Sequence, residues 1–307
     1  MKLLNTETIP RQHSARSGEL VFAATSDARQ NAAARRYQQR HDAAFTLWDL
    51  LALLAAMVLI AGVTAFSNGH SRAKGQTAIC LDNLWQLTGA WHGFVEDNQG
   101  SLPGNLDGGS NWNRTNETWC GGWMNNSAFT PDNTNWVGMM NSQLGRYVRT
   151  PAIYRCPADT SLSHGRSGLP RVRSVSMNGY LGKRSGPYTS GYRQFTLMAE
   201  VLDPAPSQAF VFIDEREDSI NEGWFPVDMT GWRPTNPAVY RIVDYPADRH
   251  NLAVNLSFVD GHAETWRWQD RRTMPAHSFA RLIPLNMPSP GNPDVARLQA
   301  VASRPIR

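Results

Sequence analysis

The longest apolar run in the chain covers residues 45–66, where Asp49 is the only charged residue. A helix rises about 1.5 Å per residue, so about 20 apolar residues suffice to cross the hydrocarbon core of a bilayer. The pattern therefore predicts a membrane-spanning helix over this run. A carboxylate inside such a segment is costly unless it has a partner, which makes Asp49 a candidate functional residue. The alternative is that its side chain reaches the headgroup layer.

Beyond this run, apolar residues recur every three or four positions at Leu84, Leu87, Trp91 and Phe94. This spacing places them on one helical face and predicts that the helix continues over residues 67–98 as an amphipathic segment. A glycine and a proline shortly afterwards predict where the helix ends. An apolar face of this kind must be covered, so we expect this half of the helix to pack on a globular core.

The second half of the chain alternates apolar and polar positions on either side of Asp260-Gly261. Asp-Gly is a strong turn signal between such arms, so residues 252–268 are predicted to form an antiparallel hairpin. The predicted fold class is α+β, with a long N-terminal helix packed on an antiparallel sheet with long loops. The globular αβ domain is expected over residues 99–275. Several prolines without apolar periodicity predict an irregular tail over residues 276–307.

The charge of the N-terminal leader predicts how the chain is oriented in the membrane. Residues 1–44 carry seven basic and four acidic side chains with little apolar periodicity. Such a leader is predicted to be disordered, and its positive charge favours the cytoplasmic side of a membrane. The rest of the chain is then expected to be periplasmic or extracellular. Most of the net charge of +4 comes from the leader, so the remainder gives no electrostatic reason to expect a nucleic-acid partner.

The three cysteines, Cys80, Cys120 and Cys156, lie in the part predicted to face outward, where disulfides are permitted. Their spacing fits no zinc-binding template and includes no Cys-x-x-Cys pair. A structural disulfide is preferred over free thiols, and the spacing by itself leaves all three pairings open.

Acidic residues cluster around residues 214–222, which makes Asp214, Glu215 and Asp218 candidate calcium ligands. The alternative is a solvated acidic loop, because Arg216 lies among the acids and the spacing of an EF-hand is absent. Apart from this calcium hypothesis, no cofactor is expected.

Catalytic motifs are weak. The segment His262-Ala263-Glu264 resembles the His-x-Glu of zinc deaminases, but no Pro-Cys-x-x-Cys follows it. The chain also contains no Gly-x-Ser-x-Gly nucleophile motif and no glycine-rich phosphate loop. We therefore expect a protein without enzymatic activity.

The start of the apolar run also resembles a processing signal. A basic leader that ends in Ala43-Ala44, followed by Phe45 and then Thr-Leu-Trp-Asp49, resembles the class III signal of type IV pilins and type II secretion pseudopilins. The resemblance implies that a prepilin peptidase cuts between Ala44 and Phe45 and methylates the new amino terminus. It also implies that Asp49 pairs with the amino terminus of a neighbouring subunit. The family usually has Gly before the cut and Glu as the acid, where this chain has Ala44 and Asp49.

A second resemblance covers residues 45 to about 272. The arrangement of His250, nine further residues and Asp260-Gly261 is similar to the His-x9-Asp-Gly signature of prepilin-like proteins common in planctomycetes and verrucomicrobia. The Cys-x-x-Asn segment at Cys80 and the Cys-Pro-x-Asp segment at Cys156 also resemble landmarks of that family. This resemblance implies a pilin-like architecture and suggests Cys80 and Cys156 as the disulfide pair.

Together these features predict a non-enzymatic pilin- or pseudopilin-like subunit, held in the inner membrane by one span with its N-terminus in the cytoplasm. The expected partners are the prepilin peptidase, other pilin subunits and the membrane. The main alternative is a membrane-anchored binding module, for example for glycans, that does not polymerise.

Overall fold

The computed structural model describes residues 46–106, 114–125, 130–182, 190–279 and 281–306. The chain divides into two units, residues Met1–Ser67 and Asn68–Arg307, and the second unit contains the sheets. The predicted leader and the predicted cleavage position between Ala44 and Phe45 lie outside the described residues.

The long helix α2 (Leu47–Asp97) begins in the first unit and ends in the second. Thr46 and Asp49 cap its start reciprocally: the backbone N–H of Thr46 donates to Asp49 Oδ2 at 3.0 Å, and that of Asp49 donates to Thr46 Oγ1 at 3.2 Å. These bonds satisfy backbone donors that the first turn of a helix leaves unpaired. Among the described residues, no helix combines the length and the apolarity needed to cross a bilayer.

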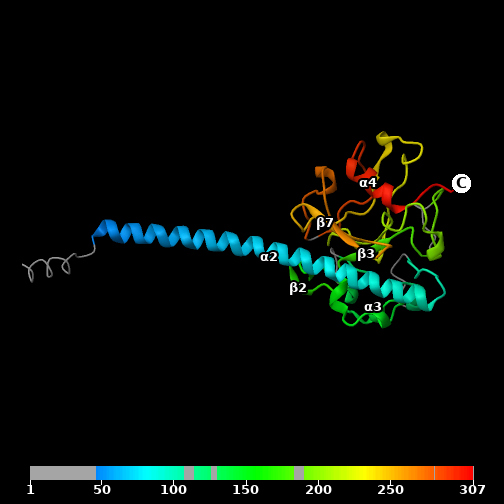
Figure 1. Cartoon of the computed structure of the whole chain (residues 1–307), viewed down its shortest axis with the longest axis horizontal. Helices are drawn as coiled ribbons and strands as arrows, with labels where there is room; N and C mark the ends of the chain where they lie inside the picture. Colours follow the sequence, from blue (N-terminus) through cyan, green and yellow to red (C-terminus); the bar gives the residue numbers. More distant parts are fainter. Residues whose placement is uncertain (1–45, 107–113, 126–129, 183–189, 280, 307) are drawn as a thin grey trace, which may run out of the picture. The chain divides into compact units, whose positions relative to one another are not determined.

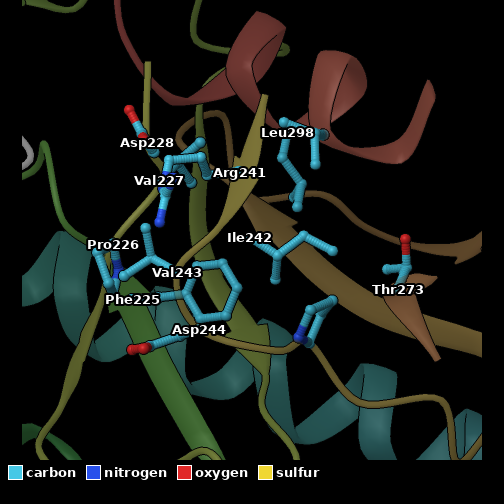
Figure 2. Close-up of a pocket in the computed structure, with 12 residues that line it drawn as sticks. Phe225, Pro226, Val227, Asp228, Arg241, Ile242, Val243, Asp244, Thr273 and Leu298 are labelled. Atoms are coloured by element: carbon cyan, nitrogen blue, oxygen red, sulfur yellow. The ribbon is translucent and has the colours of Figure 1, made fainter. Parts of the chain in front are cut away.

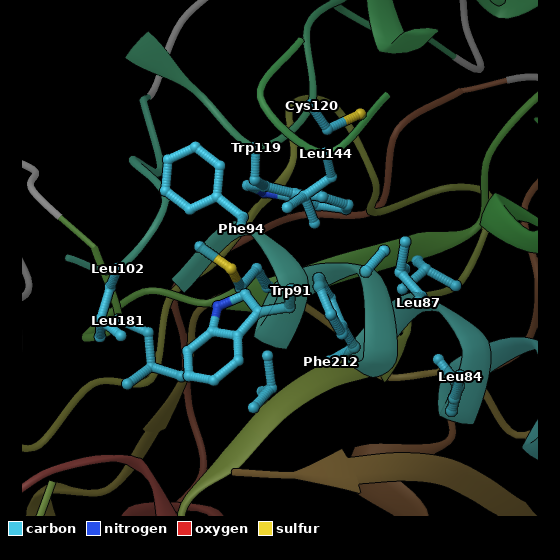
Figure 3. Close-up of a cluster of buried hydrophobic side chains, with 14 of the residues drawn as sticks. Leu84, Leu87, Trp91, Phe94, Leu102, Trp119, Cys120, Leu144, Leu181 and Phe212 are labelled. Carbon is cyan, nitrogen blue, oxygen red and sulfur yellow. The ribbon is translucent and has the colours of Figure 1, made fainter. Parts of the chain in front are cut away.

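The predicted amphipathic stripe on α2 is confirmed. Leu84, Leu87, Trp91 and Phe94 are all at most 6% exposed. Figure 3 shows them meeting side chains from the loops and from the sheet, among them Phe212. This half of the helix is therefore held by burial of its apolar face, which is the usual source of helix stability in proteins.

The main sheet has five strands in the order β5-β3-β4-β7-β8. All neighbouring strands are antiparallel except β3 and β5, which are parallel. The five strands are β3 (Val175–Asn178), β4 (Phe210–Asp214), β5 (Trp224–Phe225), β7 (Ala253–Phe258) and β8 (Ala263–Arg267). The predicted hairpin is confirmed as β7 and β8, and the fold class is α+β.

Short elements complete the second unit. Two small antiparallel pairs join β1 (Leu162–His164) to β2 (Ser167–Pro170) and β6 (Arg241–Ile242) to β9 (Met287–Pro288). The other α-helices are α3 (Val137–Met140) and α4 (Pro293–Ala302). The 3₁₀ turns are η2 (Pro131–Asn133), η3 (Gly145–Tyr147), η4 (Pro151–Tyr154), η5 (Met198–Glu200), η6 (Pro237–Val239) and η7 (Arg271–Thr273).

Two helices cover opposite faces of the main sheet (Figure 1). One core joins α2 to Met177 and Phe212, and the other joins α4 to Val254 and Leu256. On β7, Asn255 and Ser257 bind α2: Asn255 donates to the Thr77 carbonyl, and Ser257 Oγ accepts a hydrogen bond of 2.7 Å from the Thr88 hydroxyl. The contact between α2 and the sheet is thus partly polar at this strand.

The prediction of an irregular tail is wrong, because residues 276–307 contain β9 and the helix α4. Asn292 caps this helix by accepting a hydrogen bond from Asp294 N at 2.8 Å. Pro293 occupies the first helical position, where its missing N–H costs nothing. Leu298 and Ala302 then bury the apolar face of α4 on the sheet. The prolines that suggested irregularity lie before the helix or at its start.

Candidate functional site

Four side chains from four separate segments of the second unit converge at one end of the main sheet. They are Cys80 on α2, Cys156 in the turn after η4, Asp214 at the end of β4, and His250 in the turn before β7. One ligand atom from each lies within 4.8 Å of the others. All four side chains are buried, with His250 the most exposed at 8%. The cluster is therefore shielded from solvent, and its four ligand atoms are close enough together to surround one ion.

Polar side chains of α2 hold the turn that carries Cys156. Asn83 Nδ2 donates to the Arg155 carbonyl and Gln76 Nε2 donates to the Pro157 carbonyl, each at 3.0 Å. Cys80 and Asn83 are one helical turn apart and so lie on the same face of α2. The Cys-x-x-Asn segment thus places one cysteine and anchors the backbone before the other, while Gln76 anchors the backbone after it.

The hydrogen bonds of Thr77 determine which nitrogen of His250 carries the proton. The single hydroxyl hydrogen of Thr77 is donated to the Ala73 carbonyl at 3.0 Å. Its oxygen also lies 3.0 Å from His250 Nδ1, and it can therefore only accept there. His250 Nδ1 is then the protonated nitrogen, and Nε2 presents its lone pair 3.3 Å from Cys156 Sγ.

A tight turn sets the position of His250. Asn251 and Leu252 both have positive φ values, 59° and 61°, and His250 N donates to the Ala253 carbonyl at 3.2 Å. The left-handed region costs a residue such as leucine roughly 1–2 kcal/mol. This strained turn connects His250 directly to the start of β7 and so fixes the position of its backbone.

The spacing of the His-x9-Asp-Gly segment is the length of strand β7 with a turn at each end. His250 lies before the strand, and Asp260 and Gly261 form the turn to β8, where Gly261 has a φ of 96°. Six strand residues span about 20 Å, so the two ends of the segment are far apart. The structure places His250 in the buried cluster and Asp260 at a hairpin tip, where it pairs with His262.

The two carboxylate oxygens of Asp214 differ in their hydrogen bonding. Its Oδ1 accepts hydrogen bonds from Ser174 Oγ at 2.6 Å and from Arg249 at 2.9 Å. Ser174 Oγ in turn accepts from Cys156 N at 2.9 Å, which ties the two segments together. Asp214 Oδ2 is buried and has no hydrogen-bond partner among the described residues. Burial raises the pKa of this carboxyl, although Arg249 and Ser174 oppose the shift.

Cys80, Cys120 and Cys156 are all free thiols in the structure, so the predicted disulfide between Cys80 and Cys156 is not formed. The two predicted partners are nevertheless neighbours within the cluster. A hydrogen bond with Cys80, together with burial, raises the pKa of the Cys156 thiol. The third cysteine, Cys120, is buried in the core shown in Figure 3, away from the cluster.

Beside the cluster, Arg249 connects a buried network of acids. Its guanidinium lies 2.9 Å from Asp214, 2.9 Å from Glu217 and 3.8 Å from Asp159. Burial alone lowers the pKa of Arg249, but these three carboxylates together hold it well above its usual value. The Arg249 guanidinium therefore keeps its positive charge among these acids.

His277 extends this network by bridging two acids, with Nδ1 2.7 Å from Glu217 and Nε2 2.8 Å from Asp248. The hydrogen bonds to Asp248 and Glu217 raise the pKa of His277 to about 9, against the effect of burial. A raised pKa in the folded state stabilises the protein below the unfolded value of 6.5, and this contribution disappears as the pH rises through about 9.

We expect the wild-type chain to be more stable than a His277→Gln variant by on the order of 1–3 kcal/mol near pH 6. The glutamine can still form hydrogen bonds but cannot take up a proton. The difference should shrink between about pH 6.5 and pH 9 and be smallest above that range, as measured by urea unfolding across the pH series. A difference that does not change with pH would contradict the assigned role of the imidazolium.

The three candidate calcium ligands do not share one site. Asp214 faces the cluster, Glu215 accepts hydrogen bonds from Ser176 and Ser219, and Asp218 is paired with Arg216 at 2.6 Å. Successive residues at the end of a strand point to opposite faces, which separates neighbouring acids. Burial also raises the pKa of Glu215, which makes its carboxyl a weaker ligand for a cation.

A second hollow lies beneath α4 and beside β6 (Figure 2). Its lining is mainly apolar, with Phe225, Val227, Ile242 and Leu298 among the side chains. Asp228, Arg241 and Asp244 are the charged residues at its wall. Within the described ranges, the lining includes no histidine or cysteine, so this hollow lacks the thiol and imidazole groups of the buried cluster.

No model of a known protein family, no curated protein and no solved structure matches the chain.

The sequence suggested Cys80 and Cys156 as a disulfide pair, His250 as a signature residue and Asp214 as a calcium candidate, but it did not bring the four together. The usable signal was that three separate landmarks each carry a potential metal-binding side chain. Cys156 and His250 are 94 residues apart, so no local spacing connects them.

Proposed function

We propose that this protein is a non-enzymatic, pilin-like subunit of a filament of the type II secretion or type IV pilus kind. The N-terminal helix would pack against the equivalent helices of neighbouring subunits, and the sheet-containing unit would form the outer surface. The subunit would be held in the inner membrane, with its leader in the cytoplasm, until a prepilin peptidase processes it.

The observation that carries the proposal is the exposure of large apolar side chains at the start of α2. Ten of them are between 45% and 80% exposed, an arrangement that is costly in water. They are Leu47, Trp48, Leu50, Leu51, Leu53, Leu54, Met57, Val58, Leu59 and Ile60. They surround the helix rather than forming one stripe, and a helix that is apolar on all sides requires lipid or other helices around it. The membrane would surround this helix with lipid before assembly, and the filament would surround it with other helices afterwards.

Asp49 is the residue through which the filament role can be tested. In the single chain its carboxylate accepts hydrogen bonds from the backbone N–H and the hydroxyl of Thr46, at 3.0 and 2.7 Å. It therefore has a local capping role besides the proposed pairing with a neighbour's amino terminus. Charge is needed only for the pairing, since an uncharged oxygen can also cap a helix.

Two variants separate these roles. Asp49→Asn retains an acceptor for Thr46 but loses the charge, whereas Thr46→Ala removes the cap partner and keeps the charge. If the pairing operates, Asp49→Asn should reduce sedimentable filaments at least tenfold, a loss of about 1.4 kcal/mol or more per contact, while Thr46→Ala assembles. Filaments are measured by shearing, sedimentation and electron microscopy. Equal loss in both variants would assign Asp49 to capping alone.

Processing is measured separately, by N-terminal sequencing of the extracted chains. A methylated Phe45 at the mature end is expected in the wild type and in both variants. A chain that retains its leader would contradict the proposal. A processed wild-type chain that never sediments as a filament would favour the membrane-anchored binding module.

A further inference from the structure

We propose that Cys80, Cys156, Asp214 and His250 bind one zinc ion at a closed, structural site. This inference concerns the second unit alone and does not depend on filament formation. It would give the chain a metal cross-link between α2, the turn after η4, the end of β4 and the turn before β7.

The donor atoms have the type and the spacing that zinc requires. Tetrahedral zinc with Zn–S near 2.3 Å and Zn–N near 2.0–2.1 Å places its ligand atoms about 3.5–3.8 Å apart. The four ligand atoms here lie within 4.8 Å of one another, and Cys156 Sγ is 3.3 Å from His250 Nε2. The 3.3 Å pair would have to open by a few tenths of an ångström, and pairs near the 4.8 Å limit would have to close by up to about 1 Å, to accommodate the ion.

His250 is already in the form that binds metal. The Thr77 hydroxyl accepts from Nδ1–H, so Nε2 presents its lone pair to the cluster, 3.3 Å from Cys156 Sγ. Histidine ligands of metals usually donate their second ring N–H to an oxygen, which fixes the ring orientation. Thr77 supplies that oxygen from α2, the same helix that carries Cys80.

The unpartnered oxygen of Asp214 is the independent observation in favour of an ion. A buried carboxylate oxygen without a hydrogen bond is costly. Ser174 and Arg249 both donate to Oδ1, which leaves Oδ2 as the oxygen without a hydrogen bond on a carboxylate that contributes to the cluster. A cation at the centre of the cluster would satisfy Oδ2 and would explain why only one of the two oxygens is paired within the protein.

Sulfur and nitrogen donors select zinc over calcium. Calcium takes six to eight oxygen ligands, whereas thiolate, imidazole and carboxylate are all groups that bind zinc, and four of them complete its tetrahedral coordination. Binding releases the two thiol protons to solvent, because the ligands are thiolates. The two thiolates and the Asp214 carboxylate then outweigh the ion by one negative charge. The neighbouring Arg249 offsets part of this charge.

A disulfide between Cys80 and Cys156 is the competing outcome for two adjacent thiols. It would need an external oxidant, and it would leave the Nε2 lone pair of His250 and Asp214 Oδ2 buried without partners. The zinc site uses all four groups. A site this deeply buried also has no open coordination position, which distinguishes a structural zinc from a catalytic one.

The test measures zinc in the full chain, produced with zinc in the medium and purified without chelators. Mass spectrometry of the metal content should give one zinc per chain for the wild type. Cys80→Ser and His250→Ala should lose at least 90% of it. The matched control is Cys120→Ser, which removes a buried thiol outside the cluster and should retain the zinc.

Two further measurements on the wild-type chain avoid variants that fail to fold. Titration with a mercurial reagent should release the zinc as the cluster thiols react. Replacement of zinc by cobalt should produce the thiolate-to-metal absorption and the visible bands of a four-coordinate site. A metal-free wild-type chain, an intact mass that shows a Cys80–Cys156 disulfide, or zinc that His250→Ala retains would overturn the proposal.

Discussion

Replacing Arg249 by methionine is expected to lower the free energy of unfolding by about 3–5 kcal/mol, because breaking a buried ion pair leaves its partners charged and unpaired. The Arg249 side chain is 7% exposed and lies 2.9 Å from both Asp214 and Glu217. It also donates to the Glu215 carbonyl at 3.0 Å. Methionine has a comparable length and would keep most of the packing, so the loss of stability measures the charge and hydrogen bonds of the guanidinium.

The matched control is Arg272→Met. Arg272 is also paired with a nearby acid, Asp270, but its side chain is 47% exposed. Exposed ion pairs contribute about 0–1 kcal/mol, so this variant should be close to the wild type. Both variants would be unfolded with urea at the same pH and zinc concentration. Equal effects of the two substitutions would show that burial does not determine the contribution of Arg249.

Trp91→Ala is expected to lower the free energy of unfolding by about 3–5 kcal/mol, through lost burial and the cavity that remains. Trp91 is completely buried at the centre of the core between α2 and the sheet (Figure 3). Its indole N–H has no hydrogen-bond partner within the described part of the chain. Trp91→Phe removes that unpaired donor and keeps an aromatic ring, so it should cost clearly less than the alanine variant.

Trp85→Ala provides the control on the same helix. Trp85 lies less than two turns from Trp91 and is 61% exposed, and exposed substitutions usually change stability by less than about 0.5 kcal/mol. All three variants retain a helix-forming residue, and urea unfolding followed by circular dichroism compares them. A Trp85→Ala loss equal to that of Trp91→Ala would assign the effect to the helix itself rather than to the core.

Local patterns predicted the elements of the fold well. The spacing of Leu84, Leu87 and Trp91 identified the buried face of α2, and Asp260-Gly261 identified the hairpin, because helix period and turn chemistry depend on neighbouring residues. The prediction of an irregular tail is wrong because proline opposes a helix in its interior but not at its first position. Pro293 begins a helix instead of preventing one.

The candidate site could be predicted only in part. The sequence pairs Cys80 with Cys156 as a disulfide, leaves His250 apart from them, and groups the acids at residues 214–218 because they are neighbours in the chain. In the structure these neighbours point to different partners, since the chain alternates sides at the end of β4. Thr77, which sets the tautomer of His250 from 173 residues away, carried no sequence signal at all.

The amino-acid sequence by itself therefore determined the long helix, its apolar N-terminal run with Asp49, and the turns that delimit β7 and β8, because these follow from short-range periodicity and backbone preferences. The meeting of Cys80, Cys156, Asp214 and His250 depends on how α2 lies against the sheet. That packing is fixed by burial of one core shared among distant segments. It is this long-range packing that turns separate thiols, an imidazole and an acid into one candidate metal site.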